Sequence, residues 1–281
     1  MKKEYEHIVA LALKEDIGNG DITSQAVYKD DIWCEAEFIA KEDGVVAGLE
    51  VAEYIYEQLS DQISFQTEVT DGALVKRGQL IAVAEGQANI LLTGERTVLN
   101  FLQRMSGVAS YTRKFTDAVK HTPAKILDTR KTMPGQRVLD KWAVRLGGGA
   151  NHRMRLDDLF LIKENHIAVA GGIEEAIKKC DRYRRKHDLA VKIEIEVSNL
   201  DQFEKVLEQK ELVDIVMLDN MSLTDMQQAV DRAEKNIKLE ASGNISLSNV
   251  MDVAETGVDY ISVGAITHSA GALDISLLFN Q

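Results

Sequence analysis

The sequence predicts a parallel α/β barrel in its C-terminal part, preceded by a smaller domain that mixes helices and strands. After Pro123, short apolar runs alternate with amphipathic helical segments, a pattern typical of parallel strands with helices outside them. None of these runs is followed by the Gly-x-Gly-x-x-Gly motif of a dinucleotide-binding sheet. A closed or nearly closed barrel is therefore favoured.

Length, charge and apolar content set the first limits. The chain of 281 residues fits two domains, or one barrel with an extension. Its formal net charge of −12 argues against nucleic acid as a partner, and no apolar run approaches the roughly 20 residues that cross a membrane. The N-terminus lacks a signal-peptide core, and Cys34 and Cys180 stand apart without metal-type spacing. We therefore expect a cytoplasmic protein.

The N-terminal domain is expected over residues 1–121. A long helix is predicted over 88–119, with Gly107 as a break. Apolar spacing elsewhere predicts helices over 3–14 and 49–59 and strands over 32–40 and 63–69.

The barrel domain is expected over residues 122–270. Because the strand and helix patterns alternate, each strand should lie parallel to its neighbour, with a helix crossing between them. The predicted strands cover 125–127, 159–162, 191–197, 215–218, 239–241 and 260–263, and the predicted helices cover 135–146, 172–186, 200–209, 223–235 and 247–255.

Polar or small residues stand where the predicted strands end. Glu196, Asp219, Ser242 and Gly264 follow one another at intervals of 23, 23 and 22 residues, so they occupy equivalent positions in successive units. Lys163 ends an earlier strand in the same way. The carboxyl ends of barrel strands face the active site, so we expect these residues at one mouth.

A basic segment lies within this part of the chain. Residues 130–155 hold seven Lys or Arg residues against the single acid Asp140, a local charge of +6. Arg130, Lys131 and Arg153 stand among glycines and a proline rather than on a mixed-charge helix face. Guanidinium and ammonium groups gathered on loops predict a pocket for a ligand with several negative charges.

The remaining strand ends suggest further roles. Glu196 and Asp219 suit either a hydrated Mg²⁺ or the hydroxyls of a sugar that becomes cationic in its transition state. Ser242, Gly243 and Gly264 are small enough to bring backbone N–H groups to a phosphate.

Each assignment has an alternative. Lys163 also fits the Schiff-base nucleophile of a barrel lyase. Glu196 also fits an exposed edge strand, because Glu194 lies on the same face, and Asp219 also fits a helix cap. His152 is interpreted as a ligand contact, although a structural histidine is the other reading.

The ordered motifs resemble those of the quinolinate phosphoribosyltransferase family, and the resemblance covers nearly the whole chain. The motifs are Leu13-Lys-Glu-Asp-Ile-Gly-x-Gly-Asp-Ile-Thr-Ser24, Gly94-Glu-Arg-Thr-Val-Leu-Asn100, Asp128-Thr-Arg-Lys-Thr-x-Pro-Gly135, Gly147-Gly-Gly-x-Asn-His-Arg153, Leu161-Ile-Lys-Glu-Asn-His-Ile167, Glu194-Ile-Glu-Val197, Met217-Leu-Asp-Asn220, Glu240-Ala-Ser-Gly243 and Ile261-Ser-Val-Gly-Ala-Ile-Thr-His-Ser269.

The resemblance implies an incomplete, six-stranded parallel α/β barrel with an α+β open-sandwich N-terminal domain. It also implies that the C-terminal tail, about 271–281, packs back on that domain. The implied enzyme, a pentosyltransferase of NAD biosynthesis, transfers phosphoribosyl from phosphoribosyl pyrophosphate to quinolinate with decarboxylation. The expected products are nicotinate mononucleotide, pyrophosphate and CO₂, with Mg²⁺ as cofactor and a homodimer as the assembly.

The resemblance also implies roles for individual residues, with Lys131, Lys163, Glu196 and Asp219 as the catalytic set. Arg96 is expected to reach the neighbouring subunit's active site. The quinolinate carboxylates would be held by Arg130, His152, Arg153 and Lys163, and the pyrophosphate would be met by Lys131 and Lys163. The ribose hydroxyls and the metal would be held, directly or through water, by Glu196 and Asp219. The phosphate end would be lined by Ser242, Gly243, Gly264 and His268.

Two positions depart from the family pattern. Met133 replaces a threonine, and Asn244 replaces a glycine. A paralogous group associated with molybdenum transport shares the motifs and acts on another aromatic acid, which is the main alternative. A Schiff-base lyase and a non-catalytic sensor are the alternatives from other classes.

Overall fold

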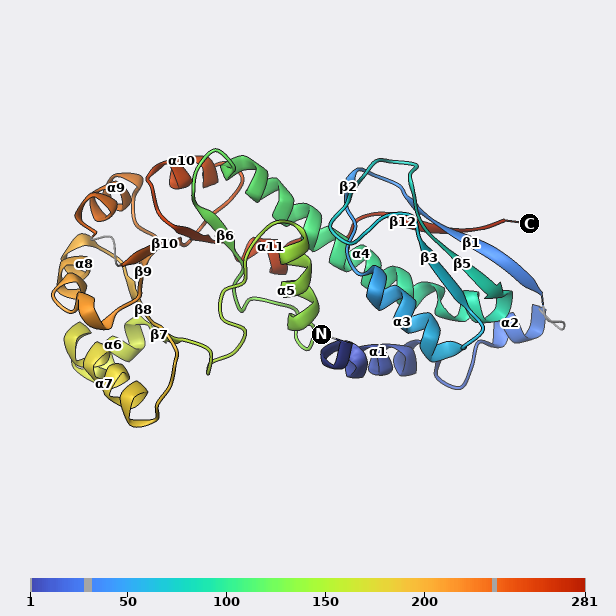
Figure 1. Cartoon of the computed structure of the whole chain (residues 1–281), viewed down its shortest axis with the longest axis horizontal. Helices are drawn as coiled ribbons and strands as arrows, with labels where there is room; N and C mark the ends of the chain where they lie inside the picture. The colour runs from blue at the N-terminus through green and yellow to red at the C-terminus, as the bar shows by residue number, and fades with distance from the viewer. Residues whose placement is uncertain (1, 28–31, 234–236, 281) are drawn as a thin grey trace. The chain divides into compact units, whose positions relative to one another are not determined.

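The computed structural model describes residues 2–27, 32–233 and 237–280 (Figure 1). The chain divides into two compact units. The first comprises Met1–Arg113, Thr132–Gly148 and Ser269–Gln281, and the second comprises Lys114–Lys131 and Gly149–His268. Both units are therefore built from separated stretches of the chain. The sequence analysis expected the C-terminal tail with the N-terminal domain, but it placed residues 132–148 in the barrel domain.

The second unit contains a six-stranded parallel sheet with the order β6-β11-β10-β9-β8-β7. The two end strands, β6 and β7, do not pair with each other in the part of the chain that the structure describes, so the barrel is incomplete, as predicted. The strands are β6 (Lys125–Leu127), β7 (Phe160–Ile162), β8 (Ile193–Val197), β9 (Ile215–Asp219), β10 (Lys238–Ser242) and β11 (Tyr260–Ser262).

Amphipathic helices follow these strands and lie outside the curved sheet (Figure 1). Their apolar faces contribute Ile177, Phe203 and Ala229, all fully buried, to the layer between helices and sheet. The helices are α6 (Glu164–Ala170), α7 (Ile173–Lys186), α8 (Leu200–Leu207), the 3₁₀ turn η1 (Lys210–Leu212), α9 (Leu223–Arg232), α10 (Val250–Glu255) and α11 (Ala265–His268).

All six predicted strands of this sheet agree with the structure to within two residues at each end. The predicted helices 172–186 and 200–209 agree equally well with α7 and α8, and α9 begins where predicted, whereas α10 begins three residues later than predicted. The short helix α6 was not predicted. The end of the fourth helix, predicted to reach residue 235, falls partly on 234–236, outside the described residues.

The first unit contains an antiparallel sheet with the order β12-β1-β5-β3 and a two-stranded pair of β2 and β4. The C-terminal strand β12 pairs along β1, with Phe38 opposite Leu277. The strands are β1 (Trp33–Ala40), β2 (Gly44–Val45), β3 (Ser64–Thr67), β4 (Leu74–Val75), β5 (Leu80–Gln87) and β12 (Ile275–Asn280). The helices are α1 (Lys2–Ile17), α2 (Ile22–Val27), α3 (Leu49–Leu59), α5 (Arg137–Leu146) and the part of α4 (Ala88–Val119) up to Arg113.

The predicted break at Gly107 was wrong, because α4 continues without interruption through it. A Cβ at this position would lie 2.0 Å from the backbone oxygen of Gly271. The glycine therefore permits the C-terminal segment to pass directly against the helix, and it is a packing residue rather than a helix end.

Candidate active site

A cleft of about 770 Å³ opens at the carboxyl ends of the strands of the second unit. Its lining contains every residue that the sequence analysis placed in the site except Arg96. Arg96 is exposed on the stretch of α4 that belongs to the first unit. The lining is formed by Thr129, Arg130, Lys131, His152, Arg153, Leu161, Lys163, Glu196, Met217, Asp219, Asn220, Ser242, Gly243, Asn244, Ile245, Ser262, Gly264, Ala265 and His268.

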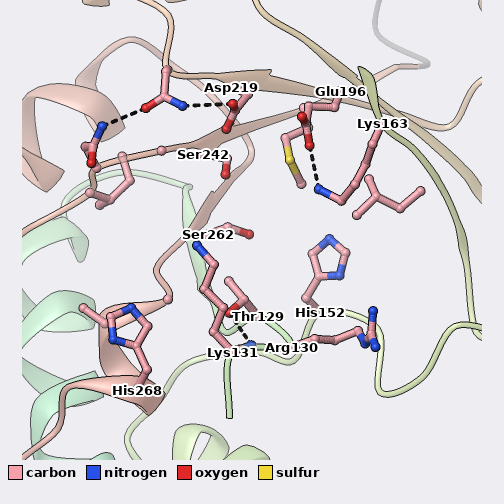
Figure 2. A pocket seen from close by; sticks show the side chains of 18 of the residues that line it. Thr129, Arg130, Lys131, His152, Lys163, Glu196, Asp219, Ser242, Ser262 and His268 are labelled. Atoms are coloured by element: carbon pink, nitrogen blue, oxygen red, sulfur yellow. Dashed lines mark hydrogen bonds and ion pairs between the residues drawn. The ribbon is translucent and has the colours of Figure 1, made fainter. Parts of the chain in front are cut away.

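The side chains of Lys163 and Glu196 point toward each other in the wall of the cleft (Figure 2). Lys163 follows β7 directly, and Glu196 lies near the end of the adjacent strand β8, so parallel pairing brings the two side chains together. The Lys163 ammonium donates to Glu196, with Nζ 2.7 Å from Oε2. Because β8 lies between β7 and β9, Glu196 is not on an exposed edge strand, and that alternative was wrong.

Asp219 ends β9 and is held by a chain of amide groups. Asn220 donates from Nδ2 to Asp219 Oδ2 at 2.9 Å, and Asn244 donates from Nδ2 to Asn220 Oδ1 at 2.9 Å. The residue that caps α9 is Ser222, whose side chain accepts from the backbone N–H of Asp225. Asp219 therefore does not cap this helix, and its carboxylate is directed to the cleft instead.

The backbone conformation between β10 and α10 allows these hydrogen bonds from Asn244 through Asn220 to Asp219. Gly243 has φ +97°, and a Cβ there would lie 2.3 Å from Asn220 Oδ1. Asn220 and Asn244 themselves adopt left-handed conformations, with φ of 54° and 52°. Asparagine tolerates this region better than most residues, so Asn244 keeps the backbone geometry that a glycine would also allow.

A cationic side of the cleft is formed by the segment after β6. Figure 2 shows Lys131 extending toward the centre of the cleft and His268 beside it. The Lys131 backbone is fixed at both ends, because its N–H donates to Thr129 Oγ1 at 3.0 Å and its carbonyl accepts from Thr267 Oγ1 at 2.8 Å. A Cβ at Gly264 would lie 3.1 Å from Lys131 Cδ and 3.2 Å from His268 Nε2, so this glycine gives both side chains their room.

Arg130 and Arg153 lie close enough to affect each other. Burial lowers the pKa of the Arg153 guanidinium, and the positive charge of Arg130 lowers it further. Arg153 also donates from Nη1 to the backbone oxygen of Leu159 at 3.2 Å. Two guanidinium groups held together against their repulsion form a preorganised site for an anionic ligand.

The loop that carries His152 is anchored by a buried carboxylate. Asp128 is fully buried and accepts from the His152 backbone N–H at 2.9 Å and from Asn151 Nδ2 at 2.6 Å. His166, by contrast, is structural, since its Nδ1 accepts from the backbone N–H of Lys163 at 3.0 Å.

Sequence reasoning missed two carboxyl groups beneath the cleft. Glu194 on β8 and Glu240 on β10 are both fully buried. Burial, with the negative charge of Glu194 adding to it, raises the pKa of the Glu240 carboxyl well above its ordinary value. The alternation Glu194-Ile-Glu196 placed both glutamates on one face of the strand, and this was the available signal.

Four basic residues of the segment 130–155 do not line the cleft. Arg137, Lys141 and Arg145 lie on α5 in the first unit, where Lys141 is fully buried, and Arg155 is on an exposed loop of the second unit. The cleft therefore combines only part of the basic segment with two carboxylates and with a rim of small residues, Ser242, Gly243 and Gly264. This combination suits an anionic substrate next to a sugar phosphate.

Comparison with known proteins assigns the chain to a family. The model of the quinolinate phosphoribosyl transferase N-terminal domain matches residues 21–106, and that of the C-terminal domain matches residues 108–278.

Relatives match over most of their length. "Quinolinate phosphoribosyltransferase [decarboxylating] 1b" of Nicotiana tabacum is 43% identical over 96% of this chain and 81% of that protein. The probable nicotinate-nucleotide pyrophosphorylase [carboxylating] of Bacillus subtilis is 41% identical over 94% and 89%. The solved nicotinate-nucleotide pyrophosphorylase of Francisella tularensis has a TM-score of 0.94 at 41% identity, covering 100% of this chain and 97% of that one. The chain therefore belongs to the quinolinate phosphoribosyltransferase family.

Proposed function

We propose that this protein transfers the phosphoribosyl group of phosphoribosyl pyrophosphate to quinolinate and releases nicotinate mononucleotide, pyrophosphate and CO₂, a step of NAD biosynthesis. One observation carries the proposal. A single cleft places Arg130, Arg153 and Lys131 beside the ion-paired Lys163 and Glu196 and beside Asp219. The relatives named above, which are 41–43% identical, carry names for this activity or its reverse.

The acceptor half of the site is formed by the guanidinium groups. Quinolinate carries two adjacent carboxylates on a pyridine ring, and forked guanidinium contacts match carboxylate geometry. Arg130 and Arg153 supply two such groups close to each other. With the carboxylates held, the ring nitrogen is directed toward the ribose half of the cleft.

The ribose half is formed by the carboxylates. As pyrophosphate leaves C1, the ribose ring gains positive charge, and fixed negative groups stabilise that charge more than they stabilise the neutral sugar. Glu196 and Asp219 lie at the ends of adjacent strands and are suited to this task. Lys131 and Lys163 would balance the negative charge of the departing pyrophosphate.

The rim of small residues fits the 5′-phosphate. Ser242, Gly243 and Gly264 expose backbone and hydroxyl groups, and His268 adds a ring nitrogen beside Gly264. Attack by the pyridine nitrogen gives a quaternised ring, which withdraws electrons from the adjacent carbon and promotes loss of CO₂. No protein nucleophile is required.

Magnesium fits the donor set of the cleft. Glu196 and Asp219 offer carboxylate oxygens, the ligands that Mg²⁺ prefers, and the cleft has space for the waters that the ion retains. When bound, the ion would neutralise charge on the pyrophosphate.

The proposed assembly is a homodimer in which Arg96 enters the neighbouring subunit's active site. The Arg96 side chain is exposed on α4. Among the described residues, α4 contributes none to the lining of the cleft in its own chain. The free cysteines Cys34 and Cys180 fit a reducing, cytoplasmic setting. In the part of the chain that the structure describes, no helix is long and apolar enough to cross a membrane.

The activity is tested by incubating the protein with carboxyl-labelled quinolinate, phosphoribosyl pyrophosphate and Mg²⁺. Labelled CO₂ and nicotinate mononucleotide are expected in equal amounts, and only when both substrates are present. A folded dimer that releases no CO₂ contradicts the proposal. Product formed from another aromatic acid, but not from quinolinate, identifies the paralogous activity instead.

A further inference from the structure

His152 lies at the boundary between the cleft and a buried group of carboxyls. Its side chain lines the cleft yet is only 9% exposed. Below it stand Glu194 and Glu240, whose side chains are 0% and 1% exposed. Burying two acids beneath an anion-binding cleft is costly unless they are hydrogen-bonded or paired.

The two carboxyls approach the same ring nitrogen. His152 Nε2 is 3.1 Å from Glu194 Oε2 and 3.6 Å from Glu240 Oε1. The Ser262 hydroxyl donates to the same Glu240 oxygen, which fixes that side chain. Neither Glu194 oxygen has a hydrogen-bond partner among the described residues, so the close contact with His152 is its main compensation.

The other ring nitrogen meets a donor. The backbone N–H of Arg153 points at His152 Nδ1, with N and Nδ1 2.7 Å apart. A nitrogen that accepts a hydrogen bond has no proton of its own, whereas a nitrogen between carboxyl oxygens must carry one. The surroundings therefore select the neutral tautomer with its proton on Nε2.

We propose that Glu194 and Glu240 are positioning residues that act through His152, holding it as a neutral Nε2–H imidazole that forms a wall of the quinolinate pocket. This rests on the proposed function. The role differs from that of a cationic carboxylate ligand, because both ring nitrogens are engaged by the protein. The negative charge of quinolinate is then met by Arg130, Arg153 and the lysines, and His152 contacts the acceptor through carbon atoms of its ring.

The raised pKa of Glu240 agrees with this arrangement. Burial of the Glu240 carboxyl beside Glu194 favours its neutral form. The buried group then carries less charge beneath the anion site than two carboxylates would.

The first test is nitrogen NMR on ligand-free protein labelled with ¹⁵N-histidine at pH 7. The His152 signals are assigned by their loss in His152→Gln. We expect a proton on Nε2 and a non-protonated, hydrogen-bonded Nδ1. Protons on both nitrogens, or on Nδ1 alone, overturn the proposal. Because no substrate is present, this result is independent of whether quinolinate is the acceptor.

The second test uses Glu194→Gln, which keeps the size of the side chain but removes its charge. Averaged or broadened His152 nitrogen signals are expected, together with a KM for quinolinate raised about 10-fold while the KM for phosphoribosyl pyrophosphate is unchanged. Glu174→Gln, on the exposed face of α7, is the matched control and should change neither. Unaltered His152 signals and an unaltered KM in a folded Glu194→Gln protein contradict the proposal. If that variant does not fold, the NMR of the unmodified protein decides alone.

Discussion

The Lys163 ammonium lies 2.7 Å from the Glu196 carboxylate, and the two residues come from the ends of adjacent parallel strands. In the proposed mechanism the pair joins the two halves of the site, because Lys163 would meet the anionic groups of both substrates and Glu196 would meet the ribose. Each side chain holds the other in a defined position before substrate binds. Such preorganisation lowers the cost of stabilising charge in the transition state.

Glu196→Gln is expected to reduce kcat by on the order of 10²-fold, because it removes a charge that opposes the positive ribose in the transition state. Steady-state kinetics with both substrates saturating measure the effect. Glu174→Gln, which also breaks a Lys–Glu pair in the second unit, is the control and should keep full activity. A Glu196→Gln enzyme with unchanged kcat would exclude the carboxylate from catalysis.

Gly243→Ala is expected to lower kcat/KM for phosphoribosyl pyrophosphate by on the order of 10²-fold, because the new Cβ displaces Asn220 and, with it, Asp219. Gly171→Ala separates this effect from backbone strain. Gly171 has a similar φ of +94°, but a Cβ there meets nothing within 4 Å. Equal losses in the two variants would mean that strain alone is responsible.

Arg104→Met is expected to reduce the free energy of unfolding by about 3–5 kcal/mol, because it leaves Asp140 buried without its ionic partner. Arg104 Nη2 is 3.0 Å from Asp140 Oδ1, and the Asp140 side chain is 2% exposed. Lys76→Met removes the exposed pair with Asp43 in the same unit and should cost less than about 1 kcal/mol. Urea denaturation measures both, and similar losses would show that the Arg104 pair is no more than a surface pair.

Arg96→Ala and Lys163→Ala proteins are each expected to be nearly inactive, and their mixture should regain activity. If Arg96 serves the neighbouring subunit, each mixed dimer has one site with both residues intact. Random exchange then restores about one quarter of the unmodified activity. If subunit exchange is confirmed and the mixture still shows no recovery of activity, Arg96 and Lys163 of one chain serve the same site.

The features that repeat along the chain were the ones that sequence could predict. Glu196, Asp219, Ser242 and Gly264 recur with the strand-helix unit, so their common location followed from the parallel topology. The family motifs then distinguished the cleft residues from Arg137 and other basic residues nearby.

Features that depend on contacts distant in sequence were not predicted. Gly107 reads as a helix break, but its role depends on the passage of Gly271 against α4. Glu194 and Glu240 read as surface or motif residues, and only the folded sheet brings both to His152. The assignment of residues 132–148 to the first unit likewise has no counterpart in local hydrophobic periodicity.

The structure of the protein in complex with quinolinate tests the central claim most directly. The two quinolinate carboxylates should lie on the guanidinium groups of Arg130 and Arg153, with the pyridine nitrogen directed toward Glu196 and Asp219. Quinolinate bound with its carboxylates against Ser242, Gly243 and His268, or not bound in this cleft at saturating concentration, would contradict the account.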